Sequence, residues 1–222
     1  MDGGDKSVRG RLFSFEGIDG VGKTTQVARV KDWLEQEGYR VQVVREPGGT
    51  PWGEAIREVL LHRASSRDAT AEFLLFAAAR AELVRAVICP WLDQGGVVLA
   101  DRYIDSSEAY QGWGGGGDLR LIRLVNDAIT EKARPTGTLW LDGVSRGDRS
   151  TQDNLESRGK EFFGRVLEGY GVLWQSQPQR IRRIDSNRDQ EEVFQSIRVA
   201  VDEWLRAQDI SPIGARKGGR MS

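Results

Sequence analysis

Cysteine and histidine are almost absent from this chain, which limits the chemistry open to it. The 222 residues include one cysteine, Cys89, and one histidine, His62. A single thiol can form neither an intrachain disulfide nor a cysteine-rich zinc site. The sequence is therefore typical of a protein from a reducing compartment, and we expect it in the cytoplasm.

An excess of positive charge and long apolar runs are also absent. The chain has 32 Lys and Arg residues against 33 Asp and Glu residues, a formal net charge of −1. Neutralising duplex DNA would need a clear basic excess, so no nucleic acid partner is expected. The first ten residues are polar, and no later segment is apolar over the width of a bilayer. We therefore expect no membrane partner and no export.

Glycine is abundant by contrast, and its most informative cluster lies at residues 17–24. These read Gly-Ile-Asp-Gly-Val-Gly-Lys-Thr, the phosphate-binding pattern G-x-x-x-x-G-K-[ST], between a short apolar segment and a helical one. Backbone N–H groups and the helix dipole would converge there on one anion, Lys23 would face the outer phosphates, and Thr24 would ligate Mg²⁺. An ordinary glycine-rich helix cap is the alternative. The predicted phosphate-chain site consists of Gly17, Ile18, Asp19, Gly20, Val21, Gly22, Lys23, Thr24 and Thr25.

Strand and helix patterns alternate along the chain, which predicts an α/β fold with a five-stranded parallel sheet flanked by helices. We expect one domain over residues 11–207, with disordered ends at 1–10 and 208–222, the second of them basic. The expected strands are 12–15, 39–44, 97–100, 138–141 and 181–185. The expected helices are 23–34, 53–61, 71–89 (ended by Pro90), 119–132, 162–174 and 192–207.

Charged residues follow two of the predicted strands. Arg45 and Glu46 precede Pro-Gly-Gly after the second strand, and Asp101 and Arg102 follow the third. Ligands of open parallel sheets bind beyond the carboxyl ends of the strands. Asp101 can hold a metal-bound water there, and Arg102 can grip a pair of phosphoryl oxygens. A turn rich in helix breakers and a salt bridge that closes a strand are the alternatives.

The helix predicted at 71–89 carries a cation on an apolar face. Phe76 and Arg80 are four residues apart, so they lie on one side of the helix. Burying an unpaired guanidinium would cost several kcal/mol. Arg80 must therefore meet either a carboxylate of the protein or the polar edge of a ligand, and the sequence leaves both open.

Two later segments have no face to bury. Four glycines at 114–117 predict a flexible loop, and residues 143–160 are charged with almost no apolar side chains. In a phosphate-handling enzyme a mobile segment that bears arginines excludes water and neutralises charge in the transition state. We therefore predict a short flap at 143–160, with a plain solvated loop as the alternative.

The motifs at 15–25, 45–50, 75–81 and 101–112 together resemble the thymidylate kinases, a family of the P-loop nucleoside monophosphate kinase group. The resemblance covers about residues 11–207. It implies a three-layer sandwich of the P-loop NTPase type and Mg²⁺-dependent transfer of the γ-phosphate of ATP to dTMP, in dTTP synthesis. It also implies a homodimer, formed through the helix near residues 77–88.

The resemblance also implies roles for individual residues. Phe76 would stack on thymine, and the polar edge of the base would be read by Arg80, Ser107 and Gln111. Asp19 would accept a hydrogen bond from the sugar 3′-hydroxyl, Arg102 would hold the monophosphate, and Asp101 would support Mg²⁺. Tyr103 would crowd the sugar 2′ position. The implied substrate-binding set is completed by Arg45 and Glu46.

The sequence departs from the family pattern where catalytic arginines are expected. Gly115 replaces an arginine after the third strand, Asn154 replaces one in the flap, and the phosphate loop has Gly20 where one type of the family has arginine. The catalytic cation must then come from the flap, where we favour Arg149, with Arg146 next and Arg158 last. Lys23, Asp19 and Arg102 complete the expected catalytic set. A kinase for another deoxynucleoside monophosphate, or a nucleotide-binding protein with weakened catalysis, is the alternative.

Overall fold

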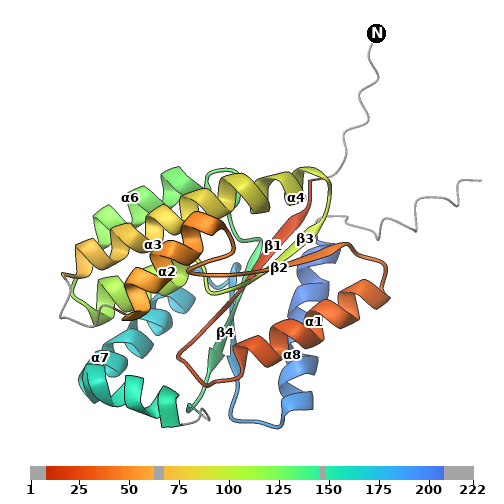
Figure 1. The fold of residues 1–222 in the computed structure, drawn as a ribbon. Helices are drawn as coiled ribbons and strands as arrows, with labels where there is room; N and C mark the ends of the chain where they lie inside the picture. Colours follow the sequence, from red (N-terminus) through yellow and green to blue (C-terminus); the bar gives the residue numbers. More distant parts are fainter. Residues whose placement is uncertain (1–8, 63–67, 146–148, 208–222) are drawn as a thin grey trace, which may run out of the picture.

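A central sheet of five parallel strands organises the molecule (Figure 1). The computed structural model describes residues 9–62, 68–145 and 149–207. The strands stand in the order β2-β3-β1-β4-β5. Their bounds are β1 Arg11–Glu16, β2 Val41–Arg45, β3 Val97–Asp101, β4 Gly137–Asp142 and β5 Ile181–Asp185. The predicted fold class, an α/β sandwich around a five-stranded parallel sheet, is confirmed.

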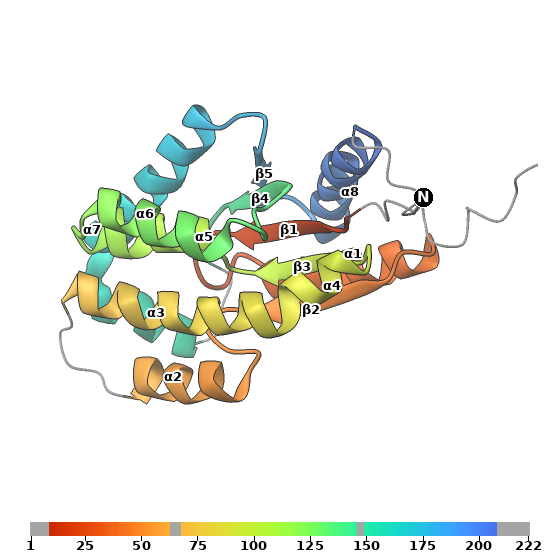
Figure 2. The same cartoon turned by 90° about the horizontal axis from the view of Figure 1, so that it is seen from above.

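Helices cover both faces of this sheet, as Figures 1 and 2 show. In chain order the larger ones are α1 Lys23–Gln36, α2 Pro51–His62, α3 Ala69–Leu83, α6 Leu119–Thr130, α7 Arg149–Ser176 and α8 Gln190–Arg206. The shorter ones are η1 Val84–Ile88, α4 Cys89–Asp93, α5 Ile104–Ser107 and η2 Glu108–Gly114, where η marks π-helical segments.

Alternating side chains of β1 enter two different cores. Phe13 and Phe15 join the cluster that contains residues of α1 and α8, whereas Leu12 joins the cluster built from η1, α4 and the end of α3. This two-residue period is what a strand buried on both faces requires. The crossover to either side of β1 makes its carboxyl end a topological switch point, where such sheets bind ligands.

The helix predicted at 71–89 does not end at Pro90, so that prediction is wrong. The chain continues through η1 into α4 and remains helical to Asp93. Pro90 lies in the first turn of α4, where a residue without an N–H costs little. The π-helical segment before it lets the helix pass the proline.

The glycine run at 114–117 is ordered by hydrogen bonds rather than being an open loop. The N–H groups of Gly115, Gly116 and Gly117 donate to carbonyls within η2 at 2.8–2.9 Å. Gly114 is needed for close packing, because a Cβ there would come within 2.7 Å of Val166 on α7. Arg165 also donates to the Gly114 carbonyl, at 2.8 Å. These contacts join α7 to η2.

Helix α7 occupies most of the predicted flap. It begins at Arg149 and is interrupted at Gly159, which has φ 79° and ψ 153°. A positive φ of this kind suits glycine, so the interruption falls where the sequence permits it. Residues 146–148 and both chain ends, 1–8 and 208–222, lie outside the described part. Gly10 is placed against the domain, because its N–H donates to the Leu92 carbonyl at 2.7 Å.

Candidate active site

The phosphate loop connects β1 to α1 at the switch point of the sheet. Gly17, Gly20 and Gly22 all have positive φ angles, of 135°, 78° and 96°. A Cβ at Gly17 would lie 2.4 Å from the Leu141 carbonyl oxygen, so only glycine fits there, whereas the space beside Gly22 is open. The loop therefore offers an exposed concave backbone at the start of α1, which is the arrangement that cradles a phosphate chain.

Lys23 is held inside this loop. Its side chain is 6% exposed, and Nζ donates to the carbonyls of Gly17 at 3.0 Å and Ile18 at 2.7 Å. Burial, followed by the charge of Arg102, lowers the pKa of Lys23 to about 7. A phosphate beside Nζ would add to the negative charge of Asp19, whose Oδ1 lies 3.9 Å from Nζ, and would raise this pKa again. The ammonium group is thus placed to serve an anion.

Two oxygen ligands lie next to the loop. The Thr24 hydroxyl donates to Asp101 Oδ2 at 2.7 Å, and both side chains can reach solvent. Among the described residues no group of three or more His, Cys, Asp or Glu side chains is arranged to bind a metal by itself. Mg²⁺ at phosphate sites needs only one or two such oxygens together with phosphates and water. Thr24 and Asp101 fit that requirement.

Arg102 stands over the loop in an unusual backbone conformation. Among the described residues, Arg102 is the one non-glycine residue with a positive φ, 71°. Nη2 donates to Asp19 Oδ1 at 2.6 Å and to the Tyr110 hydroxyl at 3.2 Å, while Nη1 donates to Ser106 Oγ at 3.1 Å. The guanidinium carbon lies 4.8 Å from the Tyr110 ring centre, a cation–π distance. The fold thus brings Arg102, Asp19 and Lys23 together.

The residues expected to read a base lie deeper, around Arg80. This side chain is 1% exposed and forms a buried ion pair with Glu46, whose carboxylate accepts from Nε at 2.9 Å and from Nη2 at 2.5 Å. Nη1 donates to Ser107 Oγ at 3.0 Å and Asn126 Oδ1 at 2.6 Å, and Nη2 also donates to the Tyr103 carbonyl. All five guanidinium hydrogens therefore have protein acceptors.

Neighbouring residues complete this buried region. Gln111 on η2 donates through Nε2 to Glu72 Oε1 on α3 at 2.9 Å. Phe76 is half-buried on α3, the helix that packs against η2. Arg45 is exposed at the end of β2 and pairs with Glu54 at 3.3 Å. Burial raises the pKa of Glu46, and the charge of Arg80 opposes this effect. Arg45 therefore lies outside the buried network around Arg80, although Glu46, the next residue, belongs to it.

Sequence reasoning missed several participants. Tyr103 is fully buried and its hydroxyl donates to the Ala133 carbonyl at 3.0 Å, while its place beside a sugar 2′ position stays a prediction. Tyr110, which contacts Arg102 through both its hydroxyl and its ring, had no role assigned from the sequence. Asn126 could have been found, because it interrupts the apolar stripe of a strongly amphipathic helix. The flap arginines stay predictions: Arg146 is outside the described residues, and only the backbones of Arg149 and Arg158 are described.

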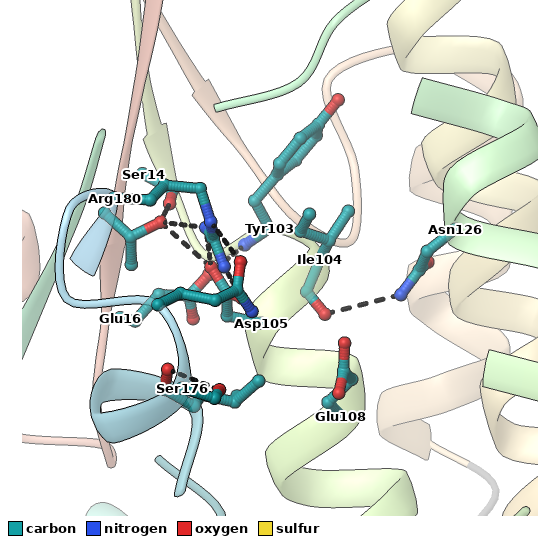
Figure 3. A network of polar contacts seen from close by, with 12 residues as sticks. Ser14, Glu16, Tyr103, Ile104, Asp105, Glu108, Asn126, Ser176 and Arg180 are labelled. Atoms are coloured by element: carbon teal, nitrogen blue, oxygen red, sulfur yellow. Dashed lines mark hydrogen bonds and ion pairs between the residues drawn. The ribbon is translucent and has the colours of Figure 1, made fainter. Parts of the chain in front are cut away.

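A separate cavity of about 210 Å³ lies away from the phosphate loop, between α5, α6 and the turn before β5. Its three basic residues are already paired with acids that line the same cavity: Arg180 with Asp105, Arg123 with Glu108, and Arg134 with Asp127. Figure 3 shows Asp105 and Arg180 facing one another in this region. Because these charges are paired within the protein, a charged ligand in the cavity would have to displace one of these partners.

The parallel sheet, with a glycine-rich loop and a buried lysine at its switch point, defines a P-loop protein of the nucleotide-handling α/β class. The family model of thymidylate kinase matches residues 15–197. The chain is 40% identical over 208 residues to "Thymidylate kinase" of Caldanaerobacter subterraneus subsp. tengcongensis, covering 91% of this chain and 100% of that one. It is 43% identical over 201 residues to that of Deinococcus radiodurans, covering 88% and 98%.

A solved structure agrees with these relatives. The crystal structure of thymidylate kinase from Ehrlichia chaffeensis superimposes with a TM-score of 0.73 at 32% identity, covering 87% of this chain and 99% of that one. This chain belongs to the thymidylate kinase family. It is accordingly a nucleoside monophosphate kinase, a phosphotransferase, and the family expected from the sequence is confirmed. Within the described residues, no helix has both the length and the apolar character needed to cross a membrane.

Proposed function

We propose that this protein transfers the γ-phosphate of ATP to dTMP, giving dTDP and ADP, in the presence of Mg²⁺. The observation that carries the proposal is the meeting of two phosphate-directed cations at the switch point. Lys23 lies inside the loop, and Arg102 is held over it by Asp19 at 2.6 Å. Donor and acceptor phosphates placed on these two cations would be brought next to each other, which is most of what phosphoryl transfer requires.

The chain's own residues would divide the work as follows. The loop amides and Lys23 bind and orient the donor phosphates, and Arg102 orients the acceptor phosphate. Thr24 and Asp101 would hold Mg²⁺, which when bound neutralises phosphate charge. A carboxylate offers about four lone-pair sites, so Asp19 can accept from a sugar hydroxyl as well as from Arg102. For the flap, we propose that Arg149, seconded by Arg146, supplies charge to the transferred group.

For the acceptor base we propose stacking on Phe76, with polar contacts from Ser107 and Gln111. Arg80 can donate to the base only if it gives up a protein acceptor, because both Nη1 hydrogens already bond to Ser107 and Asn126. The deoxy sugar would pack against Tyr110. Arg45 and Glu46 would shape the same pocket from the end of β2, Arg45 at its surface and Glu46 through its pair with Arg80.

A steady-state assay of ADP release with ATP, Mg²⁺ and a panel of monophosphates tests this function. We expect the highest kcat/KM with dTMP and much lower values with dUMP, dCMP, dAMP and UMP. A higher value with another deoxynucleotide would overturn the acceptor, and no ADP release with any of them would leave a nucleotide-binding protein. Omitting Mg²⁺ should abolish turnover.

We also propose a homodimer. Ala77 and Ile88 of the helix expected at the interface are buried inside the subunit. Large apolar side chains are exposed earlier on α3 and on the adjoining helices α2 and α6: Leu74, Trp52, Leu61 and Leu124. Exposed apolar groups on neighbouring helices favour association. Light scattering should give twice the chain mass of 24.8 kDa, and Leu74→Glu combined with Leu124→Glu should give the monomer.

A further inference from the structure

A buried carboxylate stands directly before the phosphate loop. Glu16 is the last residue of β1, is 0% exposed and precedes Gly17. Its Oε1 accepts from the Tyr103 N–H at 2.8 Å, and its Oε2 accepts from Ser106 Oγ at 2.5 Å and the Tyr170 hydroxyl at 3.1 Å. Figure 3 shows Glu16 and Tyr103 beside Asp105. Both oxygens therefore face donors from other segments.

The peptide groups on both sides of Arg102 are held by the end of β1. The N–H of Arg102 itself donates to the Phe15 carbonyl at 3.0 Å, and the next N–H, of Tyr103, donates to Glu16. The last two residues of β1 thus hold both peptide groups around the positive φ of Arg102. A non-glycine residue keeps such a backbone only where its surroundings enforce it. Glu16 is one of the groups that enforce it.

A further connection joins Glu16 to the guanidinium of Arg102 through Ser106. Ser106 donates its hydroxyl hydrogen to Glu16 and accepts from Arg102 Nη1 at 3.1 Å. Because the hydroxyl has one hydrogen, its orientation toward Glu16 leaves a lone pair for Arg102. If Ser106 turned its hydrogen elsewhere, that lone pair would turn away as well.

We propose that Glu16 is the positioning residue for Arg102, fixing its backbone through the Tyr103 N–H and its guanidinium through Ser106. Glu16 does not touch the substrates in this arrangement. It sets where the cation that receives the acceptor phosphate stands. The inference rests on the proposed function, since it assumes a monophosphate at Arg102.

The electrostatic surroundings make this role depend on protonation. Burial, then the negative charge of Asp105, raises the pKa of Glu16 to about 7. Ionised Glu16 accepts from all three donors, whereas the protonated acid must itself donate and lose one of them. Charged or titratable groups face it from α1, α3, α5, η2, α7 and the segments before α5 and β5: Lys23, Arg80, Asp105, Tyr110, Tyr170, Arg102, Tyr103 and Arg180.

The first test replaces the carboxylate by an amide of the same shape. Glu16→Gln keeps an acceptor for Tyr103 but presents N–H to Ser106. We expect KM for dTMP to rise about tenfold, the value of one hydrogen bond to a charged group, with KM for ATP unchanged. Glu108→Gln is the matched control, because Glu108 is a buried carboxylate of the adjoining helix that pairs with Arg123 and not with Arg102. It should leave KM for dTMP unchanged.

The second test asks whether the effect passes through Arg102. In an Arg102→Ala background, Glu16→Gln should change KM for dTMP less than about twofold, because the group it positions is gone. The same tenfold rise in both backgrounds would overturn the proposal, as would a parallel rise of KM for ATP. If Glu16→Gln does not fold, Ser106→Ala decides the matter, since it breaks the guanidinium link alone and should also raise KM for dTMP.

The third test is the pH profile of kcat/KM for dTMP. In the unaltered protein it should fall as pH drops through about 7, and this step should vanish in Glu16→Gln. The second ionisation of a phosphate monoester, near pH 6, remains in both proteins and serves as the internal reference. Identical profiles would contradict the role of Glu16. Absence of dTMP turnover by the unaltered protein would instead contradict the proposed function, so the two failures are distinguishable.

Discussion

The phosphate end and the base end of the candidate site are built differently, although both depend on arginine. At the phosphate end, Arg102 is partly open and its acidic partner Asp19 is 53% exposed. At the base end, Arg80 and Glu46 are 1% and 3% exposed, and every guanidinium hydrogen is taken. The first pair can exchange partners with a ligand at little cost, whereas the second must break protein contacts to do so.

This difference separates catalysis from stability. A buried charge that loses its partner costs several kcal/mol, because no water replaces the lost contacts. An exposed charge is solvated at once. Substitutions at the phosphate end should therefore reduce turnover and leave the fold intact, while substitutions at the base end should first reduce the free energy of unfolding.

The largest expected effect is on stability, from Arg80→Ala. Glu46 would be left buried without its countercharge, and we expect the free energy of unfolding to fall by about 3–5 kcal/mol. Urea denaturation without ligands measures it. Arg206→Ala, which breaks an exposed pair with Asp202, is the control and should cost less than about 1 kcal/mol. An Arg80→Ala protein of native stability that has lost only dTMP affinity would show that Arg80 acts as a ligand contact instead.

At the phosphate end, Lys23→Ala should lower kcat about 10³-fold, because the outer phosphates lose their fixed charge. The melting temperature should stay the same or rise, since the removed ammonium is buried and its nearest carboxylate, Asp19, is 3.9 Å away and half exposed. Lys31→Ala is the control on the same helix, where Lys31 pairs with exposed Glu35. Activity of Lys23→Ala within a few-fold of the unaltered protein would refute the phosphate-loop assignment.

The flap should give the next largest effect. We expect Arg149→Ala to lower kcat about 10²-fold or more, as loss of one transition-state donor does, with little change in KM for dTMP. Arg146→Ala should have a smaller effect of the same kind, and Arg158→Ala the smallest. Assays at saturating ATP compare the three. Unchanged kcat in the Arg146→Ala/Arg149→Ala double variant would remove the flap from the mechanism.

The sequence predicts the phosphate end better than the base end. Residues 17–24 are local: the pattern, the strand before it and the helix after it all lie within one short segment. Arg80 depends on distant partners, because Glu46, Ser107 and Asn126 come from three other elements. The sequence shows that a buried Arg80 needs a hydrogen-bonding partner, but it does not show whether that partner is a protein carboxylate or a ligand.

The fold itself was predictable because strand patterns in a parallel sheet are strong and uninterrupted. The errors arose where packing overrides local preference. Pro90 is accommodated by a π-helical segment, and the glycines at 114–117 are ordered by hydrogen bonds to η2 and by the packing of Gly114 against α7. Glu16 could not be assigned because its donors, such as Ser106 and Tyr170, are 90 and 154 residues away in the chain.

The smallest expected effect concerns Asp19, where the phosphate end meets the sugar. One oxygen of Asp19 accepts from Arg102, and a carboxylate can accept further hydrogen bonds. We expect the unaltered protein to prefer dTMP over its 3′-deoxy analogue by about tenfold in kcat/KM, the value of one hydrogen bond to a charged acceptor. Asp19→Asn weakens the contact with Arg102 equally for both substrates, so the ratio of their kcat/KM values reports the 3′-hydroxyl contact alone. In Asp19→Asn we expect this ratio to approach one. Asp32→Asn, farther along α1, should keep the ratio of the unaltered protein. A ratio that stays near ten in Asp19→Asn would assign the hydroxyl to another acceptor and leave Asp19 as a partner of Arg102 alone.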